Sequence, residues 1–228
     1  MNAQVVFLDF GGTLARQTNS REEAIAASLA EMGRPVAIAD AARAVAAARE
    51  RFAGRSPSGL PYARRQEHFI RLYELVAREL GFDSDARRVG EHLWETQRDS
   101  YALYPEAPAA LDELRSRGAR LGIISNWDKL DLADVCRDLG IAGCFDVILP
   151  SAEAEADKPD PRIFRRALQL AGAKAEAAAH IGDSYGADVQ GARGVGMVGI
   201  LVQREGDTAF DCPTVGGLDE VADLLARL

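Results

Sequence analysis

The 228-residue sequence contains few cysteines and no long apolar run. Cys136, Cys144 and Cys212 are odd in number and show no paired spacing, which favours reduced thiols over a disulfide framework. No apolar run reaches the roughly 20 residues that a membrane helix needs. The N-terminal residues lack the basic and apolar segments of a signal peptide. These absences predict a cytoplasmic protein without a membrane-spanning segment.

The sequence also lacks an excess of positive charge. Its formal net charge is -8 and its pI is about 5.0. Such a chain has little to attract a nucleic-acid backbone or an anionic membrane, so neither partner is expected. The hydrophobic content of 47% over 228 residues is enough for one large domain, or for a core domain with a smaller insert. Oligomeric state is not readable from these quantities.

Five apolar runs read as buried strands, because Gly, Asp, Asn and Ser flank them and open turns. These runs are residues 4–10, 119–126, 144–151, 177–184 and 197–203. Helical spacing of apolar residues fills most of the intervals, and Gly118, Gly140 and Gly172 stand where such helices would end. Strands that alternate with helices predict an α/β fold, a Rossmann-like parallel sheet with helices on both faces.

The stretch 15–102 departs from this alternation, since it shows helical patterns and no convincing strand. A Gly- and Pro-containing loop at 54–61 separates two of these patterns. We therefore predict two domains. Residues 1–14 and 103–228 form the α/β core, and residues 15–102 form a helical domain inserted after the first strand.

Polar side chains follow four of the predicted strands. Ligands of open parallel sheets bind beyond the carboxyl ends of the strands, so residues at these ends are candidates for a site. Each of them alone reads more simply as a turn residue, a helix cap or a solvated charge. The four strand ends deliver, in chain order, Asp9 with Gly11, Gly12 and Thr13; Ser125 with Asn126; Lys158; and Asp183 with Ser184 and Asp188.

In combination these side chains have a chemical meaning. Carboxylates at one sheet edge suit Mg²⁺, which prefers oxygen ligands and bridges to phosphates. A lysine and a serine hydroxyl suit the phosphate oxygens. Only three of the 27 basic residues are lysines, so the lysine at position 158 suggests that a compact point charge is needed there.

Four stretches carry a family resemblance: "FLDFGGTL", "IISN", "DKPDPRIFRRAL" and "HIGDSYGADVQGA". In order and spacing they resemble the four motifs of the haloacid dehalogenase (HAD) superfamily of hydrolases, and the match covers the whole core. The helical insert resembles the C1-type cap of that family, and "KPDP…GDSY" is similar to its phosphatase-like members. The resemblance implies a Mg²⁺-dependent phosphohydrolase of a small phosphorylated metabolite, with a cap that closes over the site and selects the substrate.

The resemblance also implies roles for the acidic residues. Asp9 would be the nucleophile and would form an aspartyl-phosphate that water later hydrolyses. Mg²⁺ would lie against Asp9, Asp183 and the backbone carbonyl of Gly11. Asp188 would support the metal indirectly, without being one of its direct ligands.

Further roles follow for the residues around the phosphoryl group. Thr13 would orient the nucleophile or the phosphate. Ser125 and Lys158 would hold the transferring group and neutralise its charge. Gly12 and Asn126 would provide nearby phosphate-binding support.

One position departs from the family pattern. Phosphatases of this family usually read D-x-D in the first motif, where the second aspartate is the general acid and base, but this chain has Gly11 there. Its carbonyl could still bind a metal, whereas its missing side chain could not move a proton. The chain could then be slow, act on a good leaving group, or take an acid from the insert, for which Tyr62, His68 and a glutamate are candidates.

The same departure leaves other functions open. Carbon–halogen hydrolysis needs neither that aspartate nor a metal, although Asp183 argues for a metal. Phosphonate cleavage needs a Schiff-base lysine from the cap, and no lysine precedes Lys129. A non-catalytic protein that binds a phosphorylated ligand or a partner is the third alternative.

Overall fold

A computed structural model describes residues 4–52, 57–97 and 99–228. The chain divides into two compact units, Met1–Arg16 with Ala102–Leu228, and Gln17–Tyr101. Residues 54–56 of the predicted loop lie outside the described residues, and 57–61 contain neither helix nor strand. Within the described part of the chain, no helix has the length and apolar content that crossing a bilayer requires.

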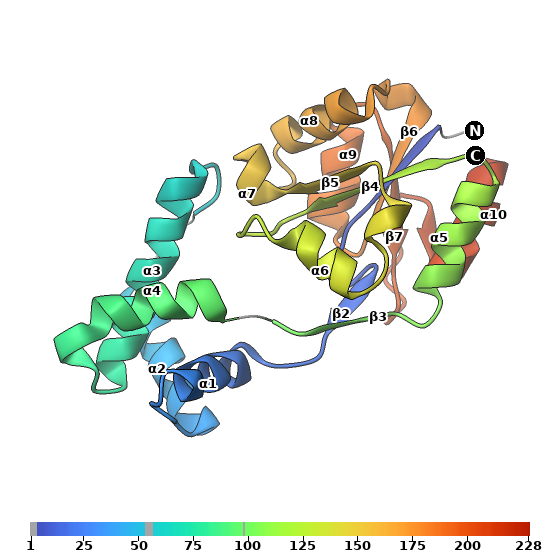
Figure 1. Ribbon diagram of the computed structural model, residues 1–228. Helices are drawn as coiled ribbons and strands as arrows, with labels where there is room; N and C mark the ends of the chain where they lie inside the picture. The colour runs from blue at the N-terminus through green and yellow to red at the C-terminus, as the bar shows by residue number, and fades with distance from the viewer. Residues whose placement is uncertain (1–3, 53–56, 98) are drawn as a thin grey trace. The chain divides into compact units, whose positions relative to one another are not determined.

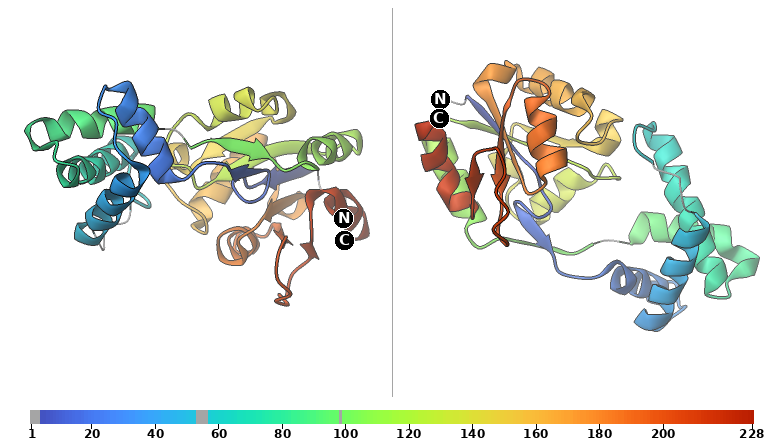
Figure 2. Two further views of the ribbon diagram at one scale, coloured as in Figure 1. Left: turned by 90° about the horizontal axis from the view of Figure 1, so that it is seen from below. Right: turned by 180° about the vertical axis from the view of Figure 1, so that it is seen from behind.

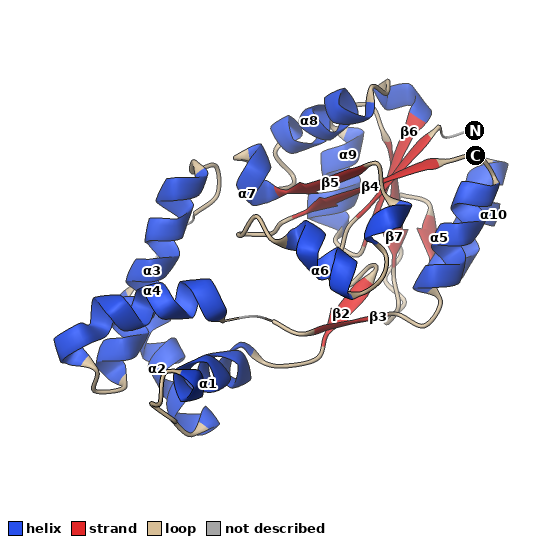
Figure 3. Ribbon diagram, viewed as in Figure 1, coloured by secondary structure: helices blue, strands red, loops and turns tan. Residues whose placement is uncertain are grey.

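The larger unit is built on one six-stranded sheet in which every neighbouring pair runs parallel (Figures 1 and 3). All four residues of its central strand are buried, as expected for a strand covered on both faces. The predicted α/β fold is therefore confirmed. In spatial order the strands are β5 (Val147–Pro150), β4 (Arg120–Ser125), β1 (Val5–Leu8), β6 (Ala178–Gly182), β7 (Val198–Val202) and β8 (Thr214–Val215).

Helices pack on this sheet and on one another. Helix α8 contacts β4 and β5, α9 contacts β7, and α5 contacts β4 and lies beside α10 (Figure 2). The predicted helix ends are confirmed, because Gly118, Gly140 and Gly172 all have positive φ angles directly after their helices. The helices of this unit are α5 (Ala107–Ser116), α6 (Leu132–Asp138), α7 (Ser151–Ala154), α8 (Pro161–Ala171), α9 (Gly191–Arg193) and α10 (Val221–Arg227).

The smaller unit is helical and has its own apolar core. Ser20 starts its first helix with a capping box, since its hydroxyl accepts from Glu23 N while the Glu23 carboxylate accepts from Ser20 N. Trp94 belongs to the core and stacks on Phe69, and Tyr62 lies beside it. The role of this unit as a cap stays a prediction. Its helices are α1 (Arg21–Glu31), α2 (Ile38–Arg51), α3 (Tyr62–Glu79) and α4 (Ala86–Thr96).

The expectation that 15–102 contains no strand is wrong at both ends of the stretch. Strands β2 (Ala15–Gln17) and β3 (Tyr101–Leu103) form a two-stranded sheet. Each has only three residues, too few for an alternation of apolar and polar side chains to show. The two strands lie more than eighty residues apart in the chain, so no local sequence pattern could reveal that they pair.

Candidate functional site

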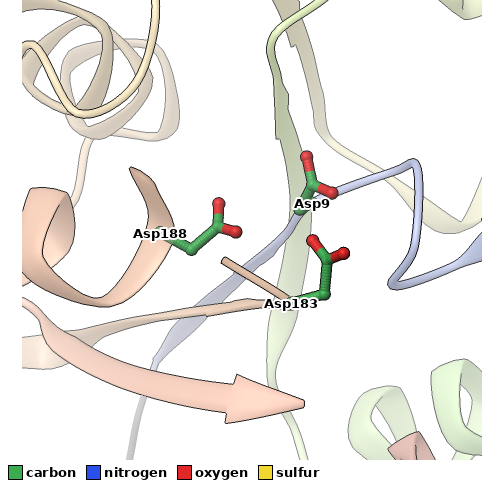
Figure 4. Close-up of side chains that lie close together, drawn as sticks. All are labelled: Asp9, Asp183 and Asp188. Atoms are coloured by element: carbon green, nitrogen blue, oxygen red, sulfur yellow. The ribbon is translucent and has the colours of Figure 1, made fainter. Parts of the chain in front are cut away.

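The register of the sheet brings the predicted site residues together. Leu8 pairs with Ile123 of β4 on one side and with Ile181 of β6 on the other, so the three strands end within two residues of the same level. Asp9 therefore lies between the ends of β4 and β6, beside Asp183. Asp9, Asp183 and Asp188 each offer a carboxylate oxygen, and these atoms lie within 4.8 Å of one another (Figure 4).

Lys158 is the cation of this cluster. Its Nζ donates to Asp9 Oδ1 at 2.6 Å, to Asp188 Oδ1 at 2.6 Å and to the carbonyl of Ile124 at 2.8 Å. An ammonium group has three protons, so all of them are in use. Burial alone would lower the pKa of Lys158, but the attraction of the two carboxylates raises it above its ordinary value. The lysine is therefore charged and fixed against the predicted nucleophile.

Asp188 is held from three sides. Besides Lys158, His180 Nε2 donates to its Oδ1 at 2.9 Å, and the backbone N of Ser184 donates to its Oδ2 at 2.9 Å. Burial alone would raise the pKa of Asp188, but Lys158 and then His180 bring it well below its ordinary value. Both oxygens are engaged by protein donors, which agrees with the supporting role predicted for this residue rather than direct coordination.

The pKa values of Asp9 and Asp183 are raised, in contrast to that of Asp188. Burial raises the pKa of Asp9, which Lys158 opposes and Asp188 increases further. Asp183 lies at the exposed edge of the site, and desolvation of its carboxyl group followed by repulsion from Asp188 raises its pKa. Neighbouring carboxylates that repel one another could be stabilised by a divalent cation, and an all-oxygen ligand set suits hard cations such as Mg²⁺, Ca²⁺ or Mn²⁺.

The loop after β1 packs closely against Asp183. Gly12 has a φ of +83°, and a Cβ on it would lie 2.2 Å from Asp183 Oδ2. A Cβ on Gly11 would meet nothing within 4 Å, so a side chain there has room. Thr13 is fully buried, and its hydroxyl contacts no hydrogen-bond partner among the described residues. Its predicted orienting role stays a prediction.

Arg204 also holds the loop after β1, and it is not among the residues predicted from the sequence. Its guanidinium donates to Thr13 O at 3.0 Å and Gly12 O at 3.5 Å, pairs with Glu106 Oε1 at 2.5 Å, and lies 3.5 Å from the Tyr104 ring centroid. Arg204 follows β7 by two residues. Arg204 directly follows the fifth apolar run, residues 197–203. The rule that ligands bind beyond the carboxyl ends of parallel strands therefore applies to it as well.

The polar residues after β4 divide into two roles. Asn126 uses both ends of its amide on the main chain of Lys158, accepting from its N at 2.7 Å and donating to its O at 3.1 Å. It therefore positions the lysine, and a direct contact with phosphate stays a prediction. Ser125 is buried at the end of β4, and its contact with phosphate stays a prediction as well.

The four motifs, the sheet and this cluster agree with a comparison against known families. A sequence model described as haloacid dehalogenase-like hydrolase matches residues 3–196. The chain belongs to this hydrolase family. The resemblance seen in the sequence is therefore confirmed.

Individual members of the family show how far the likeness extends. The bovine "Haloacid dehalogenase-like hydrolase domain-containing protein 3" is 47% identical over 116 residues, which cover 50% of this chain and 46% of that protein. A phosphoserine phosphatase of Thermus thermophilus is 38% identical over 149 residues, 62% of this chain and 58% of the relative. This hydrolase thus spans about half the length of the curated relatives it matches.

A solved structure resembles the chain over nearly its whole length. The 2-haloacid dehalogenase of Pseudomonas syringae pv. Tomato is 25% identical, with a TM-score of 0.73 and 98% coverage of both chains. The family therefore includes both a phosphatase-named and a dehalogenase-named relative of this hydrolase, and the chemistry has to be argued from the site.

The close approach of Gly12 to Asp183 yields a first prediction. Gly12→Ala forces a methyl group against the Asp183 carboxylate and strains a positive φ, so Asp183 moves and metal affinity falls at least about tenfold, a change of roughly 1.4 kcal/mol. Isothermal titration with Mg²⁺ measures this. Gly118→Ala is the matched control, because Gly118 has a φ of +88° and open space around its Cβ position. Equal metal affinity in both variants would contradict the prediction.

Proposed function

We propose that this hydrolase is a Mg²⁺-dependent phosphohydrolase that acts on a small phosphorylated molecule. The observation that carries the proposal is Asp9, a buried carboxylate whose Oδ1 is fixed by Lys158 and which lies beside Asp183. The phosphatase name of the Thermus thermophilus relative supports the substrate class.

In the proposed reaction Asp9 is the nucleophile. Lys158 engages Oδ1, which leaves Oδ2 to attack phosphorus, and the bond from phosphorus to the leaving oxygen breaks with its electron pair. Water then attacks the phosphoryl group on Asp9, and the carboxylate is restored. Asp9, Asp183 and the carbonyl of Gly11 would hold Mg²⁺, which when bound neutralises charge between the nucleophile and the phosphate.

Phosphate release tests this proposal directly. Phosphorylated metabolites and p-nitrophenyl phosphate are incubated with the protein, with and without Mg²⁺. We expect phosphate release that requires Mg²⁺, and we expect Asp183→Asn to abolish it. Asp112→Asn is the matched control, since Asp112 is exposed on α5 outside the cluster. A protein that releases no phosphate from any compound in the presence of Mg²⁺ is not a phosphohydrolase.

Metal binding has its own expected signature in thermal unfolding. Mg²⁺ at about 100 times its Kd stabilises the native state by about 2.7 kcal/mol. For a chain of this size that corresponds to a rise in Tm of roughly 5–10 °C. Differential scanning calorimetry of the wild type and Asp183→Asn, each with Mg²⁺ and with a chelator, measures the effect. A rise of the same size in Asp183→Asn would place the metal elsewhere.

Carbon–halogen hydrolysis is the second candidate, and the full-length likeness to a 2-haloacid dehalogenase favours it. The clustered carboxylates argue for the phosphohydrolase, because a metal-independent reaction has no use for Asp183. Chloride release from 2-chloropropionate in the presence of a chelator distinguishes the two candidates.

A further inference from the structure

Transfer of a phosphoryl group from an alcohol needs a proton, because the alkoxide that leaves is strongly basic. An alcohol oxygen holds its proton about as tightly as water, whose pKa is about 15.7. Position 11 offers no such proton, since its residue is glycine. The remaining groups at the carboxyl edge of the sheet therefore decide which leaving groups the site can release.

Lys158 is unsuited to give that proton. Its three N–H bonds all point to protein acceptors, on Asp9, on Asp188 and on Ile124. Giving up a proton would leave two buried carboxylates without their cation, which is strongly unfavourable.

His180 and Asp188 are unsuited for a different reason. His180 is fully buried, its Nε2 donates to Asp188, and its ring packs edge-on against Phe164. Asp188 is 1% exposed and accepts three hydrogen bonds. Neither residue presents a proton to a ligand at the strand ends.

The other groups at this edge are already assigned or are too weakly acidic. Asp9 must be ionised to attack, and Asp183 must be ionised to bind a cation. The hydroxyl groups of Thr13 and Ser125 are alcohols. They are as weakly acidic as the alcohol that the leaving alkoxide would become, so they give it no useful proton. Among the side chains of the α/β unit whose contacts at this edge are given above, none offers a proton to a departing alkoxide.

Resting on the phosphohydrolase function proposed above, we propose that the substrates are phosphates whose leaving group departs as a stable anion without a proton, with acyl phosphates as the principal class. A carboxylate leaving group corresponds to an acid of pKa about 4, some twelve units below an alcohol. The chemistry available in the α/β unit is sufficient for such a substrate.

The reaction then balances without an enzyme-borne acid. Oδ2 of Asp9 attacks phosphorus, the bond between phosphorus and the acyl oxygen breaks, and its electron pair leaves on the carboxylate. Water attacks the phosphoryl group, the bond to Asp9 breaks, and its electron pair returns to the aspartate. The hydroxide part of the water stays on phosphorus, and the remaining proton goes to a phosphate oxygen, so the products are a carboxylate and dihydrogen phosphate.

The test is a series of leaving groups. The kcat/KM of the Mg²⁺-loaded protein is measured with acetyl phosphate, p-nitrophenyl phosphate, phenyl phosphate and glycerol phosphate, in the wild type and in Gly11→Asp. We expect the wild-type value to fall steeply from the acyl phosphate to the alkyl ester. In Gly11→Asp the ratio of alkyl to acyl kcat/KM rises by about 10²–10⁴-fold, the usual contribution of a positioned acid.

The open space at position 11 makes this variant feasible, and Gly11→Asn adds the same volume without an acidic proton. Gly11→Asn therefore gives no rise in the ratio. Wild-type turnover of glycerol phosphate as fast as that of phenyl phosphate would overturn the inference and would indicate an acid other than the groups considered above, while the phosphohydrolase function stands. Failure to hydrolyse acetyl phosphate together with all three esters would overturn the phosphohydrolase function itself.

Discussion

Asp9→Asn is expected to abolish phosphate release, by about 10⁴-fold or more, because the amide is a poor nucleophile and covalent catalysis cannot proceed without the carboxylate. Its oxygen and nitrogen occupy the space of the carboxylate, so Lys158 keeps its second partner, Asp188, at 2.6 Å. The measurement is kcat with the best substrate of the screen in saturating Mg²⁺. Acid quenching followed by mass spectrometry should find one phosphoryl group on the wild-type peptide that contains Asp9, and none on the variant.

The same substitution should leave the fold intact or stabilise it. Burial raises the pKa of Asp9 in the folded protein. At pH values above this raised pKa, the ionised carboxylate therefore lowers the free energy of unfolding. The cost shrinks as the pH falls toward the ordinary value of about 4, where both states become protonated. Without metal, the Tm of Asp9→Asn should therefore equal or exceed that of the wild type at pH 7, with a smaller difference near pH 4.

These two readouts separate a nucleophile from a structural carboxylate. A structural Asp9 would lose Tm and activity together when it is replaced. Asp112→Asn is again the control for both measurements, because it removes an exposed carboxylate of the same unit. If Asp9→Asn keeps wild-type turnover, the assignment of the nucleophile is wrong.

The main residues of the cluster were predictable because one geometric rule governs them. The carboxyl ends of parallel strands meet at one edge, so Asp9, Lys158 and Asp183 could be brought together before any coordinates were known. The rule fixes the neighbourhood of a side chain and not its contacts. The rule therefore places Lys158 in the site, and only the structure shows that its three protons bind two carboxylates and a carbonyl. The predicted contact of Lys158 with phosphate stays a prediction.

Residues outside strand ends could not be found in this way. His180 lies inside β6, where a buried histidine looks like any other core residue, and its partner is eight residues further along the chain. The pairing of β2 with β3 was equally invisible, because three-residue strands carry no pattern and their contact is non-local. Long-range partners are set by tertiary packing rather than by local sequence.

Lys158→Met is expected to have the largest effect on stability. It leaves Asp9 and Asp188 buried without the cation that both contact at 2.6 Å. Breaking a buried ion pair from one side costs about 3–5 kcal/mol, which for a chain of this size lowers the Tm by roughly 6–20 °C. Lys174→Met is the matched control, because Lys174 is exposed and such surface substitutions stay within about 0.5 kcal/mol.

The pH dependence of this loss follows from the directions of two pKa shifts. The pKa of Asp188 is lowered, so its contribution to stability is present above the ordinary value of about 4 and is lost as the pH falls through the lowered value. The pKa of Lys158 is raised, so its contribution is present below the ordinary value of about 10.4 and is lost as the pH rises through the raised value. The stability difference between the wild type and Lys158→Met should be largest between the raised pKa of Asp9, the other partner of Lys158, and about pH 10. It should shrink in acid, first as Asp9 and then as Asp188 takes up a proton.

A double-mutant cycle isolates the coupling between the two charges. Asp188→Asn alone removes one carboxylate and leaves Lys158 paired with Asp9, so we expect it to cost less than Lys158→Met. The variant with both changes lacks one of the two buried carboxylates that make Lys158→Met costly, so its loss should fall short of the sum by about 1–3 kcal/mol. Urea unfolding of the four proteins at pH 7 measures this difference. Strict additivity would mean that the Lys158–Asp188 contact contributes nothing to the folded state, and the lysine would then be retained for its position beside the nucleophile alone.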